Sequence, residues 1–132
     1  EKVACDAFKL ANNQKLTLNK VTDGVVGFAN VEKVINSDYD GLLYGGYIEN
    51  TYENQVTISD STLDDVFGSA FGDINSNNSI TAIGGSIENI VGGFCYQIGS
   101  DKTSVAANSN DIITEKISID SVIGGLTGEV YI

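Results

Sequence analysis

Residues 54–71 read NQVTISDSTLDDVFGSAF, and residues 78–95 read NSITAIGGSIENIVGGFC. The two segments align without a gap when Asn54 is matched to Asn78. Apolar residues occupy matching positions, as in the pairs Val56 with Ile80 and Val66 with Ile90. Self-similarity at a fixed period of about 20–50 residues is typical of repeat architectures, in which each supersecondary unit stacks on the next. We therefore interpret the chain first as a series of repeats.

Further copies extend the pattern in both directions. A third copy, DIITEKISIDSVIGGL, occupies residues 111–126, and its spacing from the second copy is longer by eight residues. The excess falls in the polar stretch SDKTSVAANSN at 100–110, which is typical of a loop insertion. Looser copies lie at 13–29 and 41–47. The copies share a terminal glycine, found at Gly27, Gly45, Gly68, Gly92 and Gly124.

Each copy contains two short runs with high strand propensity. One alternates polar and apolar residues, as at Val56 and Ile58, and the other is β-branched or aromatic and ends in glycine. A unit this short cannot bury its own apolar face, so neighbouring copies must stack. We predict an all-β fold, a parallel β-solenoid of about five rungs over residues 13–132, with in-register strands about 4.8 Å apart.

Asparagines open several copies, at Asn13, Asn54 and Asn78. In a stack of parallel, in-register strands such residues can form a ladder, each side chain bonding to its neighbours. The alternative is that they are unrelated turn residues, because asparagine is common where strands begin.

The N-terminal segment has a different pattern. In KVACDAFKLANN, at 2–13, one helical face would carry Val3, Ala4, Ala7, Phe8 and Ala11. We predict a short amphipathic helix within residues 1–12 that caps the open edge of the first rung, in one domain with the repeats. A disulfide between Cys5 and Cys95 would fasten this cap to the stack. The alternative is two buried thiols that act as small hydrophobic side chains.

Composition excludes several classes of function. The 132 residues contain 18 acids and seven lysines, with a net charge of −11, and no His, Arg, Trp, Met or Pro. Without histidine, Ser-His-Asp and Cys-His catalysis and histidine-containing zinc sites are impossible. The acidic charge disfavours nucleic acid and anionic membrane surfaces as partners, and no apolar run is long enough to insert into a membrane. We expect no enzymatic activity.

One segment resembles part of a calcium loop. Asn36, Asp38 and Asp40 alternate before Gly41, as in the first half of such a loop, but Tyr47 stands where an EF-hand needs glutamate. The sequence predicts at most a weak Ca²⁺ site at these three residues, and an ordinary polar corner is the alternative. No other cofactor is expected.

Other candidate groups are aromatic or acidic. Tyr44 takes the place of Phe67 in the repeat and Tyr47 that of Ala70, so both are expected to pack inside, which leaves Tyr39 and Tyr52 as loop aromatics for carbohydrate or protein recognition. Asp64 and Asp65 are adjacent on an expected strand. Because adjacent strand residues face opposite sides, we do not expect them to form a glycosidase pair.

The strings LLYGGYIEN, NQVTIS, NSITAIGGSI and IVGGF resemble the repeats of bacterial autotransporter passengers and adhesins, over about residues 41–132. This resemblance implies a secreted, elongated β-solenoid that serves adhesion or scaffolding, and it implies no catalytic residues. Those passengers are long and end in a membrane barrel, and neither feature is present in this sequence.

From these observations we expect an extracellular or cell-surface structural protein, processed from a precursor because the chain has no Met. Its subunits would associate end to end into a filament or surface layer, because an uncapped last rung is a template for another chain. The alternatives are a fragment of an adhesin stalk, or a calcium-dependent module that binds a host or matrix glycan or protein through residues 36–53.

Overall fold

The structure is a computed structural model that describes residues 2–5, 15–26, 30–46, 52–71, 74–98, 107 and 109–130. Within these ranges the chain is all-β and contains no helix. Its strands are, in chain order, β1 (Lys2–Cys5), β2 (Leu16–Asn19), β3 (Asp23–Val26), β4 (Val31–Ile35), β5 (Asp38–Tyr44), β6 (Gln55–Phe67), β7 (Ser79–Val91), β8 (Phe94–Ile98), β9 (Asp111–Glu115), β10 (Ser118–Ile123) and β11 (Leu126–Val130).

The strands pair in parallel, copy beside copy. β6 pairs with β7 from Gln55 beside Ser79 to Phe67 beside Val91. β7 then pairs with β9 and β10, from Ser79 beside Asp111 to Val91 beside Ile123. These are the same residue pairs that the alignment of the copies matches, so the predicted parallel, in-register pairing of these copies is confirmed.

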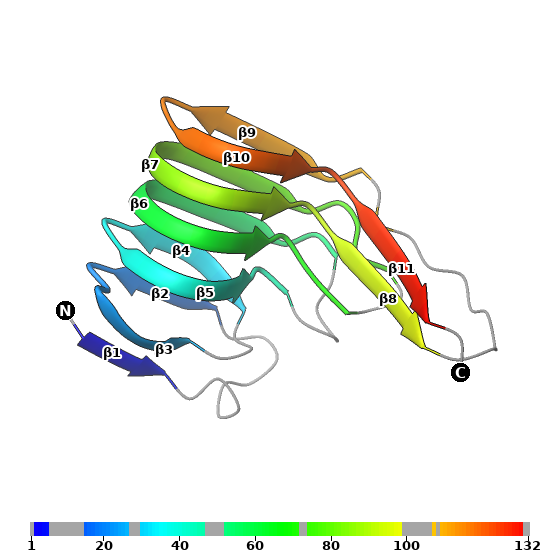
Figure 1. Ribbon diagram of the computed structural model, residues 1–132, viewed down its shortest axis with the longest axis horizontal. Coiled ribbons are helices and arrows are strands. Elements are labelled where there is room, and N and C mark those ends of the chain that lie inside the picture. Colours follow the sequence, from blue (N-terminus) through cyan, green and yellow to red (C-terminus); the bar gives the residue numbers. More distant parts are fainter. Residues whose placement is uncertain are drawn as a thin grey trace.

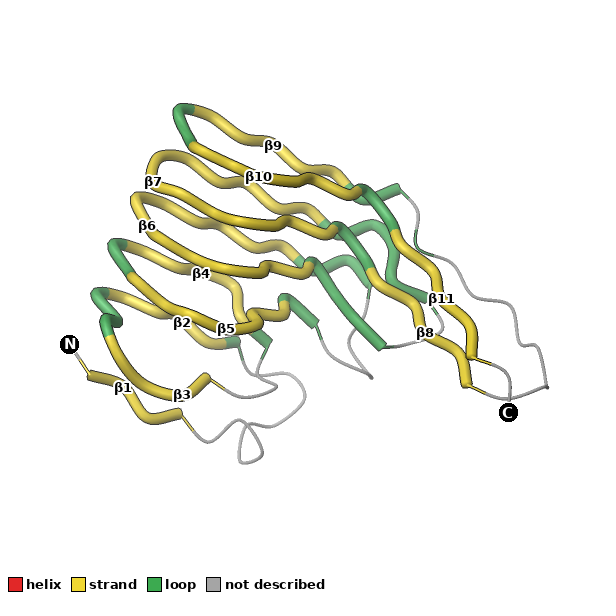
Figure 2. The backbone as a smooth tube through the Cα atoms, in the orientation of Figure 1, coloured by secondary structure: helices red, strands yellow, loops and turns green. Residues whose placement is uncertain are grey.

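The described strands lie in five successive levels, which are stacked one above another in Figure 1. Level 1 contains β2 and β3, level 2 contains β4 and β5, and level 3 contains β6. Level 4 contains β7 and β8, and level 5 contains β9, β10 and β11. One seven-stranded sheet joins the levels, β1 and β3 form a two-stranded sheet at the N-terminal end, and β8 and β11 form another that extends away from the stack (Figure 2).

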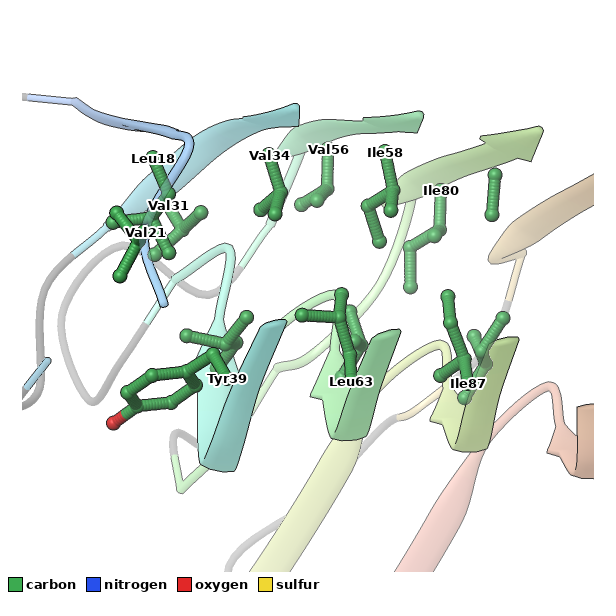
Figure 3. Packing of buried hydrophobic residues seen from close by; sticks show 14 residues of the cluster. Leu18, Val21, Val31, Val34, Tyr39, Val56, Ile58, Leu63, Ile80 and Ile87 are labelled. Atoms are coloured by element: carbon green, nitrogen blue, oxygen red, sulfur yellow. The ribbon is translucent and has the colours of Figure 1, made fainter. Parts of the chain in front are cut away.

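The core lies between the two halves of each level. Side chains of β6 alternate between exposed and buried from Gln55 to Ile58, as expected for a strand with one face in the core. Val56 and Ile58 from the first half of level 3 face Leu63 from its second half, and the same arrangement repeats in neighbouring levels (Figure 3). The result is columns of apolar side chains along the stack.

The N-terminal segment forms a strand, which corrects the helix predicted within residues 1–12. Residues Lys2–Cys5 form β1, which pairs in parallel with β3, and residues 1 and 6–12 lie outside the described residues. An extended segment supplies partners for the backbone N–H and C=O groups along the outer edge of β3. A helix satisfies its backbone groups internally and could not have done so.

Candidate functional site at the C-terminal edge

A ladder of asparagines runs through the stack. The backbone N–H and the side-chain amide of Asn54 both donate to Oδ1 of Asn78, each at 3.0 Å. Asn78 repeats this pattern toward Oδ1 of Asn110, again at 3.0 Å for each bond. Asn54 and Asn78 are buried, so the ladder supplies hydrogen bonds where water cannot.

The register places Asn30, and not Asn13 as predicted, level with Asn54, whose Oδ1 accepts a hydrogen bond of 3.1 Å from Nζ of Lys15. Lys33 pairs with Thr57, so the residue level with Asn54 is Asn30, which is buried. Asn13 lies outside the described residues. The prediction of a ladder was right for Asn54 and Asn78. Asn110 was missed, although the offset between the second and third copies would have identified it.

A second column marks the bend between the two halves of each level. The bend residues have left-handed backbone conformations at Lys20, Asn36, Asp60, Gly84 and Lys116, with φ between 47° and 74°. The residue after the bend is Ser37 in level 2 and Ser61 in level 3, and the Ser37 backbone N–H donates to Oγ of Ser61 at 3.0 Å. These bends fold each level back over its own apolar face.

A third column consists of glycines that allow neighbouring levels to approach closely. A Cβ atom on Gly45 would lie 2.5 Å from the carbonyl oxygen of Gly68, and one on Gly68 would lie 2.3 Å from that of Gly92. One on Gly92 would meet the Gly124 carbonyl oxygen at 2.2 Å. A Cβ on Gly124 would meet nothing within 4 Å, because no described level follows.

The core columns are likewise left uncovered at level 5. Val66 and Ile90 are 1% and 0% exposed, whereas Val122, the next residue in their column, is 52% exposed. In the first half of the level, Thr114 is exposed, although its column partners Ile58 and Ala82 are buried. Among the described strands β9, β10 and β11 each have a partner on one side only. Level 5 therefore presents unpaired strand edges next to unfinished core; we name this surface the C-terminal edge.

The opposite end of the stack is closed. Leu18 and Val21 in level 1 are 0% and 1% exposed, in contrast to Thr114 and the half-buried Ile117 at the corresponding positions of level 5. β1 lies along the outer side of β3 at this end. The two ends of the molecule thus differ in exposure of the core, which makes the C-terminal edge the candidate functional surface.

The residues of the predicted calcium site lie at a bend and on the strand that follows it. Asn36 occupies the bend, and Asp38 and Asp40 follow on β5, all three with exposed side chains. Alternate residues of an extended strand are about 6.6 Å apart, whereas a calcium loop must curl to bring its oxygens together. Among the described residues no group of three or more acidic, cysteine or histidine side chains could hold a metal ion.

The aromatic and acidic candidates are mostly occupied by packing or hydrogen bonds. Tyr44 is buried and stacks on Phe67 with ring centroids 5.2 Å apart, as predicted. Tyr39 is also buried, which corrects its assignment as a loop aromatic, while Tyr52 is exposed and Tyr47 lies outside the described residues. Asp65 accepts a hydrogen bond of 2.6 Å from the amide of Asn89.

The alternation of buried and exposed side chains along β6 is interrupted at Asp64 and Asp65. Asp64 and Asp65 are both half-buried between the buried residues Leu63 and Val66, so they do not simply face opposite sides of the sheet. The pairing register passes over Asp64, from Leu63 beside Ile87 to Asp65 beside Asn89. The carboxylate of Asp65 is engaged with Asn89, which does not suit it to act with Asp64 as a catalytic pair.

The predicted disulfide between Cys5 and Cys95 is not formed. Cys95 is a buried thiol that takes part in no disulfide, and its Sγ accepts a hydrogen bond of 3.1 Å from the amide of Asn75. Cys5 lies on β1, beyond level 1, and Cys95 lies on β8 in level 4. Four strand spacings of about 4.8 Å each separate these levels. Their sum is far more than the roughly 7 Å that a disulfide can span between Cα atoms.

Comparisons with protein-family models, with curated proteins and with solved structures gave no match. No helix of the described residues has the length and hydropathy needed to cross a membrane.

Proposed function

We propose that the chain is a β-solenoid subunit that assembles end to end as an extracellular structural protein. In this account the five levels are five rungs, β1 is the N-terminal cap, and the C-terminal edge receives the first rung of another copy. The exposure of Val122 carries the proposal, because its column partners Val66 and Ile90 are each buried by the level that follows, whereas no described level follows Val122. A second copy would bury Val122 in the same way and pair the free edges of β9 and β10.

Charge favours a head-to-tail arrangement of copies. Residues 1–33 contain five lysines and four acids, a net charge of +1, whereas residues 111–132 contain one lysine and four acids, a net charge of −3. Two C-terminal edges brought together would repel each other, while an N-terminal end is electrostatically compatible with a C-terminal edge. A heterologous contact of this kind generates an open filament when the rotation between copies does not close a ring.

The shape of the two ends supports the same arrangement. Level 1 bends at Lys20 with φ of 56°, and level 5 bends at Lys116 with φ of 52°, so the two levels change direction through the same backbone conformation. β2 and β3 could therefore continue the parallel sheet beyond β9 and β10. The role outside the cell rests on the resemblance to secreted adhesin repeats.

Substitution of Val122 by lysine tests the proposal. Val122→Lys puts a charge where the next rung must pack, and charges that point inward on an edge strand prevent edge-to-edge association. Ser86→Lys adds the same charge to an exposed position on β7, inside the stack, and serves as the matched control. Sedimentation velocity over a series of concentrations should show assembly of the wild type and of Ser86→Lys, and monomers for Val122→Lys. A wild type that stays monomeric at every concentration would overturn the proposal.

A segment of an adhesin stalk is the second candidate, because the exposed side chain of Val122 would also be covered if further rungs followed in the same chain. In this case further rungs of the same type would cover Val122, and the isolated chain would remain monomeric. Fusing a second copy of residues 107–132 to the C-terminus should then raise the thermal midpoint, whereas self-assembly of the unfused chain would exclude this candidate.

A further inference from the structure

One face of the stack is uncharged at its centre. The first halves of the five levels, which are β2, β4, β9 and the first parts of β6 and β7, lie side by side in parallel register (Figure 2). On β6 and β7 the side chains that alternate with the buried ones point outward, and none of them is charged: Gln55, Thr57, Ser59, Ser79, Thr81 and Ile83. We name the outward side of these five strands the first-half face.

Two exposed isoleucines lie on neighbouring strands of the first-half face. Ile83 on β7 is 42% exposed, and Ile113 on β9 is 58% exposed. Ile113 is the register partner of Thr81, which lies two residues before Ile83, so the two isoleucines are diagonal neighbours. Branched side chains on a pleated surface suit packing against a second sheet. The face therefore offers an apolar contact next to its uncharged centre.

The charges at the two ends of the first-half face are opposite in sign. Residues 15–20 and 30–35 of levels 1 and 2 contain three lysines and one acid, whereas residues 111–116 of level 5 contain two acids and one lysine. Lys33 is exposed on β4, and Asp111 and Glu115 are exposed on either side of Ile113 on β9. If a second copy faces the first in the opposite direction, Lys33 of each copy lies near these two acids of the other. Copies that face each other in the same direction would bring like charges together.

The second halves of the levels do not offer a similar surface. Residues 38–44, 61–67, 85–91 and 118–123, which form these halves in levels 2 to 5, contain six acids and no lysine. Two faces of this kind would repel each other. Self-pairing is thus restricted to the first-half face, and because both copies use the same face, the pairing is complete with two.

The first-half face is too small to hold two single copies together. Five strands spaced about 4.8 Å apart, each about five residues long, cover on the order of 400 Å². A stable interface buries about 800 Å² on each partner. In two filaments the same contact recurs at every copy, and the contacts reinforce one another. We propose that the first-half faces join two antiparallel filaments into a ribbon. This inference rests on the proposed function, and it adds a lateral partner, a second filament of the same chain.

An exchange of charges tests the inference. Lys33→Glu puts an acid near Asp111 and Glu115 of the other filament, and Asp111→Lys with Glu115→Lys puts lysines near Lys33. Each variant alone should form single filaments, with about half the mass per unit length of wild-type ribbons in scanning transmission electron microscopy. Filaments of the two variants, grown separately and then mixed, should pair again, because each contact between them then joins opposite charges. Failure of the mixed filaments to pair would contradict the assigned contact.

A matched pair of substitutions on β7 separates the two faces and leaves both ends of the stack unchanged. Ile83→Glu and Ser86→Glu add the same charge to exposed positions of level 4, the first on the first-half face and the second on the acidic half. Ile83→Glu should form single filaments, and Ser86→Glu should form ribbons like the wild type. Single filaments of the wild type, ribbons of Ile83→Glu and Lys33→Glu, or loss of pairing in Ser86→Glu as well would overturn the inference while the proposed function stands. Absence of filaments in the wild type would overturn the proposed function itself.

Discussion

Asn54 gives two hydrogen bonds to a single oxygen of Asn78, one from its backbone N–H and one from its side-chain amide, both 3.0 Å long. Asn78 in turn gives two to Asn110. Because both donors of each asparagine converge on the next one, the ladder fixes the register between levels as well as satisfying buried polar groups. A slip by one residue would leave several buried donors without acceptors.

Asn78→Ala should therefore destabilise the protein strongly. The substitution leaves the backbone N–H and amide of Asn54 without their acceptor and removes the donor to Oγ of Ser69. A buried donor without a partner costs about 1–3 kcal/mol, so the free energy of unfolding should fall by about 3 kcal/mol. Denaturation by urea measures this. Asn19→Ala, at an exposed position on β2, should change it by less than about 0.5 kcal/mol, and equal losses in both variants would contradict the role of the ladder.

The glycine column predicts opposite results for the same substitution at two levels. Gly68→Ala would bring a Cβ within 2.3 Å of the carbonyl oxygen of Gly92 and within 2.9 Å of the Asn78 Cβ, so levels 3 and 4 would have to separate. We expect a loss of about 3 kcal/mol or failure to fold. Gly124→Ala meets nothing within 4 Å, and the monomer should keep its stability to within about 0.5 kcal/mol in urea denaturation. Similar losses in both variants would contradict this packing.

The left-handed bend at Lys116 predicts a gain in stability. Its φ of 52° is costly for most side chains but tolerated by asparagine, which occupies the same bend at Asn36. Lys116→Asn should raise the free energy of unfolding by about 0.5 kcal/mol, and the β-branched Lys116→Val should lower it by about 1 kcal/mol or more. Glu115→Val, one residue earlier on β9, is the control and should be nearly neutral. If valine changes the free energy of unfolding equally at positions 115 and 116, the left-handed backbone at the bend does not restrict the side chain there.

Because Cys95 is not joined in a disulfide, we expect a reducing agent to leave the stability of the protein unchanged. A disulfide from Cys5 to Cys95 would close a long loop and contribute about 4 kcal/mol, which reduction would remove. The structure instead places Sγ of Cys95 next to the amide of Asn75, inside the core. Thermal midpoints measured with and without dithiothreitol should coincide. A large decrease on reduction would show that the two cysteines are joined after all.

The sequence determined the pairing of the later copies because their apolar positions repeat without a gap. It was less informative at the first two levels, where the register shifts between Leu16 and Thr17 and between Tyr39 and Leu42. Such irregularities change which residues face inward, and Tyr39 was consequently assigned to a loop. The strand at Lys2–Cys5 depends on a partner edge that only the folded first level provides, so the local helical pattern was misleading there.

The C-terminal edge was predictable in kind but not in detail. A last repeat without a capping segment implied an open end, but which side chains are exposed depends on the direction of stacking. In the glycine column the Cβ positions of Gly45, Gly68 and Gly92 all point to the level that follows, whereas at the bend those of Gly84 and Gly85 point back to level 3. This direction follows from the handedness of the backbone and is not encoded in any single motif.

Gly124→Ala shows whether a further rung from a second copy packs on level 5. The added methyl group is harmless to the isolated subunit, because nothing lies within 4 Å of it, but it points to where the next level would lie. We expect a folded monomer of normal stability whose assembly, followed by sedimentation velocity, needs a concentration about tenfold or more above that of the wild type. Assembly of Gly124→Ala at the wild-type concentration would contradict it.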